Sequence, residues 1–384
     1  MMQKATRQHT KQHNSRLVLK TIYDHAEISR AEIARLTHLT RTTVSELVSD
    51  LIVDGLVEET GTGISIGGKP PILLSVNPVA RQLVTLDLSG DHFEGALVDL
   101  QGRLLKRIVL PDDLLEGEQA LNAACDLVDS LVTAASAPVA GIGVGSPGLI
   151  DTGLGVVRRA VNLNWVDMPL QQHLAARFDL PVVVANDSHL SAMAEYMFGE
   201  GRGISNLIVI KVSQGIGSGI VLDGQLYYGD GFGAGEIGHI RAAENNIRCT
   251  CGNTGCLETV ASTRAILRQI SGKLPTNGLY SLGQVVEAYH SGEVAVQEVV
   301  HQAAACLGAT IAYMAGILNI HNIILTGPVR AFGESFLDVV RAEVASRLLL
   351  NLAEEIDIRF SSLGDDDVLL GASALILSQE FGLP

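Results

Sequence analysis

Apolar residues recur at helical spacing near the start of the chain. From Ser15 to His25 they follow the 3.6-residue period of an α-helix, which predicts a first helix there. Ser29, with Glu32 three positions later, has the form of a capping box. This pair predicts that a second helix covers Arg30 to Leu36.

A third helix is predicted between Thr40, which can cap its N-terminus, and Gly55, which can end it. Its apolar residues from Val44 to Leu51 share one face. The residues left exposed at its N-terminal end are Arg41, Thr42, Thr43 and Ser45. Two helices joined by a tight turn form a helix-turn-helix, whose second helix contacts base edges and phosphates with these positions. These four residues are therefore candidate DNA-binding residues.

Two short strands are predicted next, from Leu56 to Glu59 and from Pro71 to Val76. The glycine-rich segment between them, Gly61 to Pro70, would form a wing, with Lys69 placed to contact phosphate or the minor groove. We therefore expect residues 1–80 to form a winged helix-turn-helix domain that binds DNA. A structural helix bundle or a protein-binding module has a similar pattern and is the alternative.

From residue 83 onward, strands and helices alternate. Three alternating apolar runs predict a β-meander, which a helix and a buried strand follow (83–88, 94–100, 103–110, 120–135 and 139–144). Similar units recur later in the chain (strands 208–211, 219–222 and 323–326; helices 294–318 and 331–349). The repetition predicts an α/β body of two lobes with a cleft between them, which we place at residues 81–185 and 186–384.

Charge is divided unevenly between the two parts of the chain. The first 81 residues carry ten Lys and Arg against eight Asp and Glu, whereas the remainder carries 17 against 34. Five basic residues and no acidic one lie within the first twenty positions: Lys4, Arg7, Lys11, Arg16 and Lys20. A basic arm beside an acidic body suits a protein that presents one end to the phosphate backbone, although a solvated tail has the same composition.

The remaining composition excludes several classes of protein. No apolar run reaches the roughly 18 residues that a membrane span needs, and the N-terminus lacks the pattern of a signal peptide. We therefore expect a cytoplasmic protein with no membrane partner. Five cysteines in 384 residues argue against a disulfide framework. Cys125 and Cys306 lie alone in apolar helical surroundings and are expected to be core residues.

The other three cysteines share one short segment with a histidine. His239 is followed by Cys249, Cys251 and Cys256, with two glycines that allow tight turns between them. Three thiolates and one imidazole complete the tetrahedral set of a structural zinc site and leave no position open for catalysis. The alternative is a group of free thiols beside an unrelated surface histidine.

The segment from Gly235 to Glu258 carries a still more specific pattern. Glu236-x-x-His239, followed by Cys-x-Cys-Gly-x-x-Gly-Cys-x-Glu, resembles the signature of the ROK family, whose members are sugar kinases and sugar-responsive transcription repressors. The resemblance covers nearly the whole chain. It implies that a two-lobed actin-like ATPase domain, of the ribonuclease H-like class, follows the winged helix-turn-helix and holds a sugar site in its cleft.

Asn186 and Asp187 follow the short apolar strand Val182 to Ala185. A carboxylate at a strand-to-helix junction beside a cleft can accept a hydrogen bond from a substrate hydroxyl, and in a kinase it could act as general base. The alternative role of Asp187 is to cap the next helix. By the resemblance, Asn186 is a sugar ligand and Asp187 occupies the position of the kinase base, which also contacts the sugar.

The resemblance implies four further sugar contacts: Asn162, Glu236, His239 and Glu258. Carboxylate and amide groups suit a sugar because they exchange hydrogen bonds with its paired hydroxyls. His239 would contact both the sugar and the zinc ion. The metal would therefore hold the loop in place rather than take part in chemistry.

The expected nucleotide side of the cleft departs from the kinase pattern. In the first phosphate loop, residues 87–91, Ser89 replaces a glycine and Asp91 replaces a threonine. A carboxylate at this position would repel a triphosphate, whereas Asp87 is kept and could lie near a metal ion. The second loop has Gln214 where a threonine is usual, and Pro328 stands where kinases carry a glycine.

We therefore expect a sugar-responsive transcription repressor without enzymatic activity. Its expected partners are operator DNA, a sugar effector and further copies of itself in a homodimer or homotetramer, with zinc as a structural cofactor. The alternative is an ATP-dependent sugar kinase with an appended DNA-binding domain, in which Asp187 acts as base. A repressor that docks a transport protein in place of a sugar is a third hypothesis. The sequence identifies neither the sugar nor whether it is phosphorylated.

Overall fold

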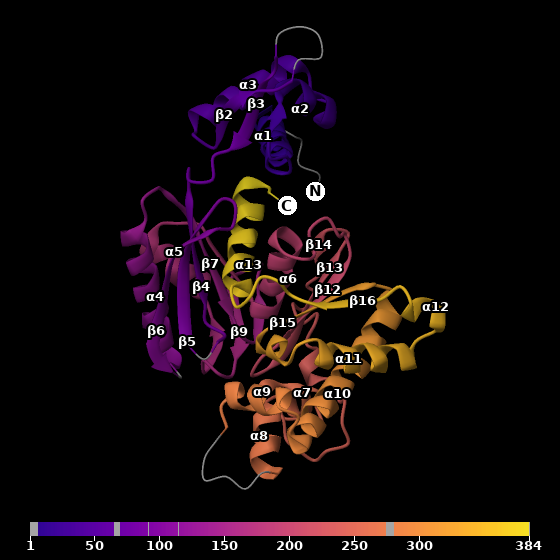
Figure 1. Ribbon diagram of the computed structural model, residues 1–384. Helices are drawn as coiled ribbons and strands as arrows, with labels where there is room; N and C mark the ends of the chain where they lie inside the picture. Colours follow the sequence, from indigo (N-terminus) through magenta and orange to yellow (C-terminus); the bar gives the residue numbers. More distant parts are fainter. Residues whose placement is uncertain (1–6, 65–69, 91, 114, 274–279, 384) are drawn as a thin grey trace.

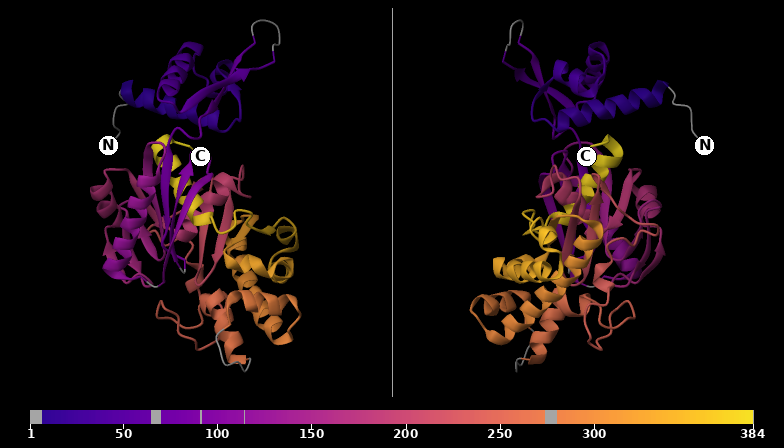
Figure 2. Two further views of the ribbon diagram at one scale, coloured as in Figure 1. Left: turned by 60° about the vertical axis from the view of Figure 1, so that its left-hand side comes forward. Right: turned by 90° about the vertical axis from the view of Figure 1, so that its right-hand side faces the viewer.

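A computed structural model describes residues 7–64, 70–90, 92–113, 115–273 and 280–383 of the protein. The N-terminal domain stands at one end of the molecule, and the larger body extends from it (Figures 1 and 2). Two five-stranded sheets form the frame of this body, with helices around and between them.

The N-terminal domain has the three predicted helices, α1 (Arg7–Tyr23), α2 (Arg30–Thr37) and α3 (Arg41–Val53). The capping box is confirmed, because the side chain of Ser29 accepts from the backbone N–H of Glu32 and the Glu32 carboxylate accepts from the N–H of Ser29. Thr40 caps α3 as predicted. The helix predicted from Ser15 to His25 is shorter than α1, which begins at Arg7. The residues between Gln8 and Ser15 lack an apolar period, but their Gln and Lys side chains favour an exposed helical extension.

A three-stranded sheet completes this domain as a winged helix. Its strands are β1 (Ile28–Ser29), β2 (Val57–Thr62) and β3 (Ile72–Val76), in the order β1-β3-β2. β2 and β3 are the two predicted strands, whereas β1 was not predicted because only two residues form it. Lys69, at the predicted wing, lies outside the described residues.

The first large sheet begins with the predicted meander and continues with parallel strands. Its order is β6-β5-β4-β7-β11, formed by β4 (Gln82–Asp87), β5 (His92–Asp99), β6 (Leu104–Asp113), β7 (Val139–Ser146) and β11 (Val182–Asn186). β7 pairs in parallel with both β4 and β11. Helices α4 (Gly117–Ala134) and α5 (Leu170–Phe178) pack against it, and β8 (Leu149–Asp151), β9 (Val156–Ala160) and β10 (Trp165–Met168) form a small separate sheet.

The second large sheet repeats this topology. Its order is β14-β13-β12-β15-β16, formed by β12 (Leu207–Val212), β13 (Ile216–Leu222), β14 (Gln225–Leu226), β15 (Asn322–Thr326) and β16 (Asp357–Phe360). As in the first sheet, an antiparallel meander is extended by two parallel strands on the side of its first strand. Two sheets with one topology confirm the duplicated, ribonuclease H-like fold. The helices after β14 are α7 (Glu258–Ala261), α8 (Thr263–Lys273), α9 (Leu282–His290), α10 (Val294–Leu318), α11 (Glu334–Arg347) and α12 (Leu350–Ala353), with short turns η1 (Ile237–His239) and η2 (Pro328–Phe332).

Two helices lie side by side between the sheets (Figure 1). α6 (Asp187–Phe198) packs on β12 and β13, and α13 (Asp367–Ile376) packs on β4 and β7. The two helices approach so closely that a Cβ on Gly371 would lie 1.9 Å from the backbone oxygen of Leu190. α13 thus returns from the end of the chain to the first sheet. The division of the body at residues 185 and 186 stays a prediction.

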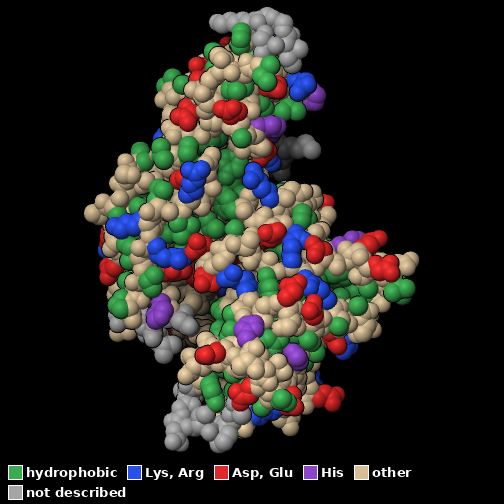
Figure 3. Space-filling view, viewed as in Figure 1, with side chains coloured by type: hydrophobic (Ala, Val, Ile, Leu, Met, Phe, Trp, Pro, Cys, Tyr) green, Lys and Arg blue, Asp and Glu red, His purple; other side chains and the backbone are tan. Residues whose placement is uncertain are grey.

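The winged helix is joined to the body by more than its linker. Nη2 of Arg16 donates to the backbone oxygens of Gln379 and Glu380, at 3.0 and 3.3 Å, in the final turn η3 (Leu377–Phe381). Val18 of α1 and Leu383 near the C-terminus are buried in one hydrophobic cluster. Hydrophobic side chains gather where the two parts meet (Figure 3).

α10 is the one helix among the described residues that is long and apolar enough to cross a membrane. Its buried residues, such as Val300, Leu307 and Ile311, belong to the core of the second lobe. Packing inside the protein therefore accounts for its composition.

Candidate functional site

One cavity of about 460 Å³ brings together all six residues that were predicted to contact a sugar. They are Asn162 after β9, Asn186 and Asp187 at the start of α6, Glu236 and His239 at η1, and Glu258 at the start of α7. The turn from Ser213 to Gly217, between β12 and β13, lines the same cavity. Its volume suits a small polar molecule. The role of each residue as a sugar ligand stays a prediction.

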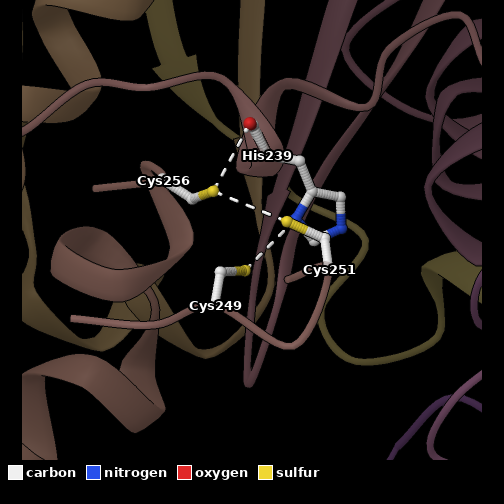
Figure 4. A group of neighbouring side chains, drawn as sticks. All are labelled: His239, Cys249, Cys251 and Cys256. Atoms are coloured by element: carbon white, nitrogen blue, oxygen red, sulfur yellow. Dashed lines mark hydrogen bonds between the residues drawn. The ribbon is translucent and has the colours of Figure 1, made fainter. Parts of the chain in front are cut away.

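The predicted metal ligands converge beside this cavity (Figure 4). The ligand atoms of His239, Cys249, Cys251 and Cys256 all lie within 4.8 Å of one another. Zinc–sulfur bonds of about 2.3 Å and zinc–nitrogen bonds of about 2.0 Å require tetrahedral edges of about 3.8 Å for sulfur–sulfur and about 3.5 Å for sulfur–nitrogen. The Sγ atoms of Cys251 and Cys256 are 3.7 Å apart, and Sγ of Cys249 is 3.5 Å from Nδ1 of His239. The four side chains therefore fit a zinc ion.

Glu236 lies between the metal ligands and the cavity. Its Oε2 is 3.8 Å from Nε2 of His239, the nitrogen that points away from the cysteines. A carboxylate that faces this nitrogen can fix the orientation of the imidazole ring. Burial, reinforced by Asp187 and Glu258, raises the pKa of Glu236 to about 7. Near neutral pH the carboxyl group can therefore either donate or accept a hydrogen bond.

Asn186, rather than Asp187, caps helix α6. Oδ1 of Asn186 accepts from the backbone N–H groups of Ser188 and His189, at 2.8 and 3.2 Å, and Nδ2 donates to the oxygen of Gly148 at 2.9 Å. Capping of this helix, the alternative role predicted for Asp187, is thus performed by Asn186. The cap fixes the first turn of α6, which leaves the carboxylate of Asp187 beside the cavity.

Lys211 is a site residue that the sequence reasoning missed. It stands on β12, is only 8% exposed, and its Nζ lies 3.1 Å from Oδ2 of Asp187 and 3.3 Å from Oγ of Ser89. Ser89 in turn donates to Oδ1 of Asp87 at 2.6 Å. A single lysine within the apolar run of β12 was the signal that could have revealed it, because a buried ammonium needs anionic partners.

Glu258 has a cationic partner that was not predicted. Its Oε1 accepts from Nη2 of Arg264 at 3.1 Å, and Arg264 lines the cavity as well. A Cβ on Gly215 would lie 3.0 Å from the other carboxylate oxygen. Glu258 is therefore held between an arginine and the glycine turn, at the boundary of the cavity and the metal cluster.

The predicted nucleotide side is described only in part, because Asp91 lies outside the described residues. Gly327 has a φ of 87°, and a Cβ there would lie 2.6 Å from the oxygen of Val212, so glycine is required at this turn. Pro328, which follows, begins η2 and offers no N–H to a ligand.

The candidate DNA-binding residues lie at the start of α3 as predicted. Arg41, Thr42 and Ser45 are exposed, whereas Thr43 is half-buried and its hydroxyl is 2.9 Å from that of Thr40. Val44 and the other apolar residues of α3 face the core of the domain. The N-terminal end of α3 is therefore open to a partner.

A winged helix on a duplicated α/β body with a polar cavity defines a DNA-binding protein with a ligand site. The profile of a winged helix-turn-helix DNA-binding domain matches residues 12–58, and that of the ROK family matches residues 83–379, more than half of the chain. The chain therefore belongs to the ROK family, as the cysteine segment indicated.

Three relatives differ in how much of this chain they match. The xylose repressor of Caldicellulosiruptor bescii is 34% identical over 97% of this chain and 98% of its own length. The solved structure of a ROK family transcriptional regulator, a homologue of the E. coli MLC protein, is 26% identical, with a TM-score of 0.86 over 98% of both chains. A ROK family glucokinase from Streptomyces griseus, solved with glucose and AMPPNP, is 28% identical with a TM-score of 0.69 over 77% of this chain and 98% of its own. This chain thus aligns with the two regulators over nearly all of its length and theirs, and they support a regulatory role.

The metal cluster leads to a first prediction. We expect the purified protein to contain about one zinc ion per chain by elemental analysis, and Cys251→Ser to lose that ion and unfold at a lower temperature. Cys251 is exposed, and an exposed Cys→Ser change without a metal would alter stability by only about 0.5 kcal/mol. Cys306→Ser, a half-buried cysteine on α10, is the control that should keep the zinc. Absence of zinc from the wild-type protein would contradict the site.

Proposed function

We propose that this protein is a transcription repressor of genes for sugar uptake or catabolism, and that a sugar bound in the cavity controls its binding to operator DNA. Repression places its action in the cytoplasm, where operator and sugar meet. The observation that carries the proposal is the presence in one chain of a winged helix and of a polar cavity in a body similar to sugar kinases, and relatives named as repressors match this chain over more than nine-tenths of its length.

The DNA-binding half of the proposal rests on helix α3. Arg41, Thr42, Thr43 and Ser45 would contact bases and phosphates, and Lys69 would contact phosphate from the wing. A single winged helix covers only one half-site, so we propose that two copies act together in a homodimer or a homotetramer.

The sugar-binding half rests on the donor and acceptor groups of the cavity. Asn162, Glu236, Glu258 and Asp187 would exchange hydrogen bonds with sugar hydroxyls, and His239 would contact the sugar from the metal side. The amide of Asn186 is engaged by α6 and Gly148, so its contribution would be chiefly to hold Asp187 in place. Zinc, when bound by His239 and the three cysteines, would rigidify the loop that carries these groups.

We further propose that phosphoryl transfer has been lost. Asp91 would face a triphosphate with a like charge, and Pro328 removes an N–H at the expected adenosine side. Asp187 would then be a vestigial base that serves as a sugar ligand. The alternative function, an ATP-dependent sugar kinase with an appended DNA-binding domain, keeps one supporting observation, namely that this carboxylate lies in the cavity.

A ligand screen separates these two functions. Thermal unfolding of the full-length protein would be followed with D-xylose, D-glucose, N-acetyl-D-glucosamine and their phosphates, each with and without Mg-ATP. A sugar at a hundred times its Kd should add about 2.7 kcal/mol of stability. We expect one sugar to raise the melting temperature, no further rise with Mg-ATP, and no sugar-dependent ATP turnover. Turnover with that sugar would favour the kinase instead.

Two substitutions should separate DNA binding from sugar binding. Arg41→Ala is expected to weaken binding to a duplex selected by the wild-type protein from random DNA, by about tenfold, without changing sugar affinity. Asp187→Asn should weaken sugar binding and leave the affinity for the same duplex unchanged. Lys106→Ala removes an exposed positive charge from β6 and serves as the charge-matched control for Arg41. Unaltered DNA affinity in Arg41→Ala would refute the placement of the recognition helix.

A further inference from the structure

A continuous set of polar contacts crosses the floor of the cavity and involves residues from both sheets. It begins at Asp187 on α6, passes to Nζ of Lys211 on β12, continues to Oγ of Ser89 after β4, and ends at Asp87. Ser89 is one of the residues by which the first loop departs from the kinase pattern. Its hydroxyl accepts from the ammonium group of Lys211 and donates to the carboxylate of Asp87, which a glycine could not do.

The ammonium of Lys211 is the cation for several buried carboxylates. Asp87 and Asp367 are 7% and 4% exposed, and the side chain of Asp187 is 15% exposed. Burial alone would lower the pKa of Lys211, but Asp187, Asp367 and Asp87 outweigh it, so the pKa is raised and the lysine is charged. Asp367 is also stabilised by hydrogen bonds from Ser191 and Thr326, at 2.7 and 2.9 Å.

Carboxylate oxygens are the ligands that a divalent cation prefers, and those of Asp187, at the cavity, and of Asp87, beneath it, act on one ammonium group. Here an internal ammonium already lies between Asp187 and Ser89. It engages Oδ2 of Asp187, so the orientation of this carboxylate is fixed and Oδ1 is left to accept from a hydroxyl. Because Lys211 belongs to the second sheet and Ser89 directly follows β4 of the first, the same ammonium also joins the two lobes under the ligand.

We propose that Lys211 is the positioning residue for the effector, acting as an internal cation in place of a divalent metal ion, so that sugar binding needs no such ion in the cavity. This inference rests on the proposed sugar site. The competing explanation is that Lys211 only neutralises buried acids and has no influence on the ligand. The two explanations differ in what happens when the ammonium is removed and a cation is supplied from solution.

The test compares the full-length, zinc-loaded wild-type protein with Lys211→Met, after removal of loosely bound metal by a chelating resin. Binding of Mn²⁺ would be measured by electron paramagnetic resonance without any sugar. We expect no Mn²⁺ at the cavity of the wild type and one bound Mn²⁺ in Lys211→Met, since the carboxylates then lack their cation. Binding of Mn²⁺ by the wild-type cavity, or none by the variant, would overturn the proposal.

Sugar binding supplies the second readout, measured by calorimetry with the sugar that stabilises the wild type in the screen above. Wild-type affinity should not change with millimolar Mg²⁺. Lys211→Met should bind about tenfold or more weakly, as expected for loss of a charge-assisted contact, and Mg²⁺ or Mn²⁺ should restore part of that loss. Unchanged affinity in the variant would show that Lys211 only neutralises charge, and a loss that no cation restores would contradict its role in place of a metal ion.

Two controls keep the result interpretable. Lys211→Arg retains the charge, so it should fold and bind no Mn²⁺, but its broader head group should still weaken sugar binding; wild-type affinity in this variant would contradict a positioning role even if Lys211→Met fails to fold. Lys106→Met, at an exposed lysine of β6, should behave as wild type throughout. If no sugar binds to the wild-type protein, the proposed function fails, whereas the Mn²⁺ measurement still tests Lys211.

Discussion

The close packing of α6 against α13 is the contact on which the rest of the structure depends. Each helix covers a different sheet, so the two lobes are held together wherever these helices touch. The approach requires Gly371, because any side chain there would collide with the backbone of Leu190. Interiors this dense do not deform continuously, so a shift of one lobe must be transmitted to the other or resisted.

The same pair of helices lies between the cavity and the winged helix. α6 begins at the capping residue Asn186 and at Asp187, both at the cavity. The segment after α13 carries the two carbonyl groups that accept from Arg16 of α1. Control of DNA binding by a sugar requires an element whose arrangement both sites influence, and this helix pair, extended by the turn η3, reaches from the cavity to helix α1 of the winged helix. The candidate metal cluster would have a more local role, since an ion bound there would fix a loop beside the cavity.

Much of this protein could be predicted from local sequence patterns. The capping box at Ser29 and Glu32 and the cap at Thr40 follow from side chains within four residues of their partners, so they were visible in the sequence. The four candidate metal ligands were equally visible because they lie in one short segment. The meander of the first sheet followed from its alternating apolar residues.

Contacts between distant segments were not predictable in this way. Lys211 and Ser89 are far apart in the sequence, and only the pairing of the two lobes brings them together. The packing of α13 on the first sheet could not be predicted for the same reason, since a ten-residue apolar helix does not indicate which sheet it will cover. The role of Asn186 was assigned to its neighbour because either residue type can cap a helix, and only the backbone geometry distinguishes them.

The central claim is that one ligand in the cavity changes the affinity of the winged helix for DNA. It is tested most directly by measuring the Kd for the selected duplex as the stabilising sugar is titrated, and the Kd for that sugar with and without the duplex. The account predicts that the sugar changes DNA affinity in a saturable manner, and that the duplex changes sugar affinity by the same factor, because linkage is reciprocal. Equal DNA affinity at zero and saturating sugar would contradict it.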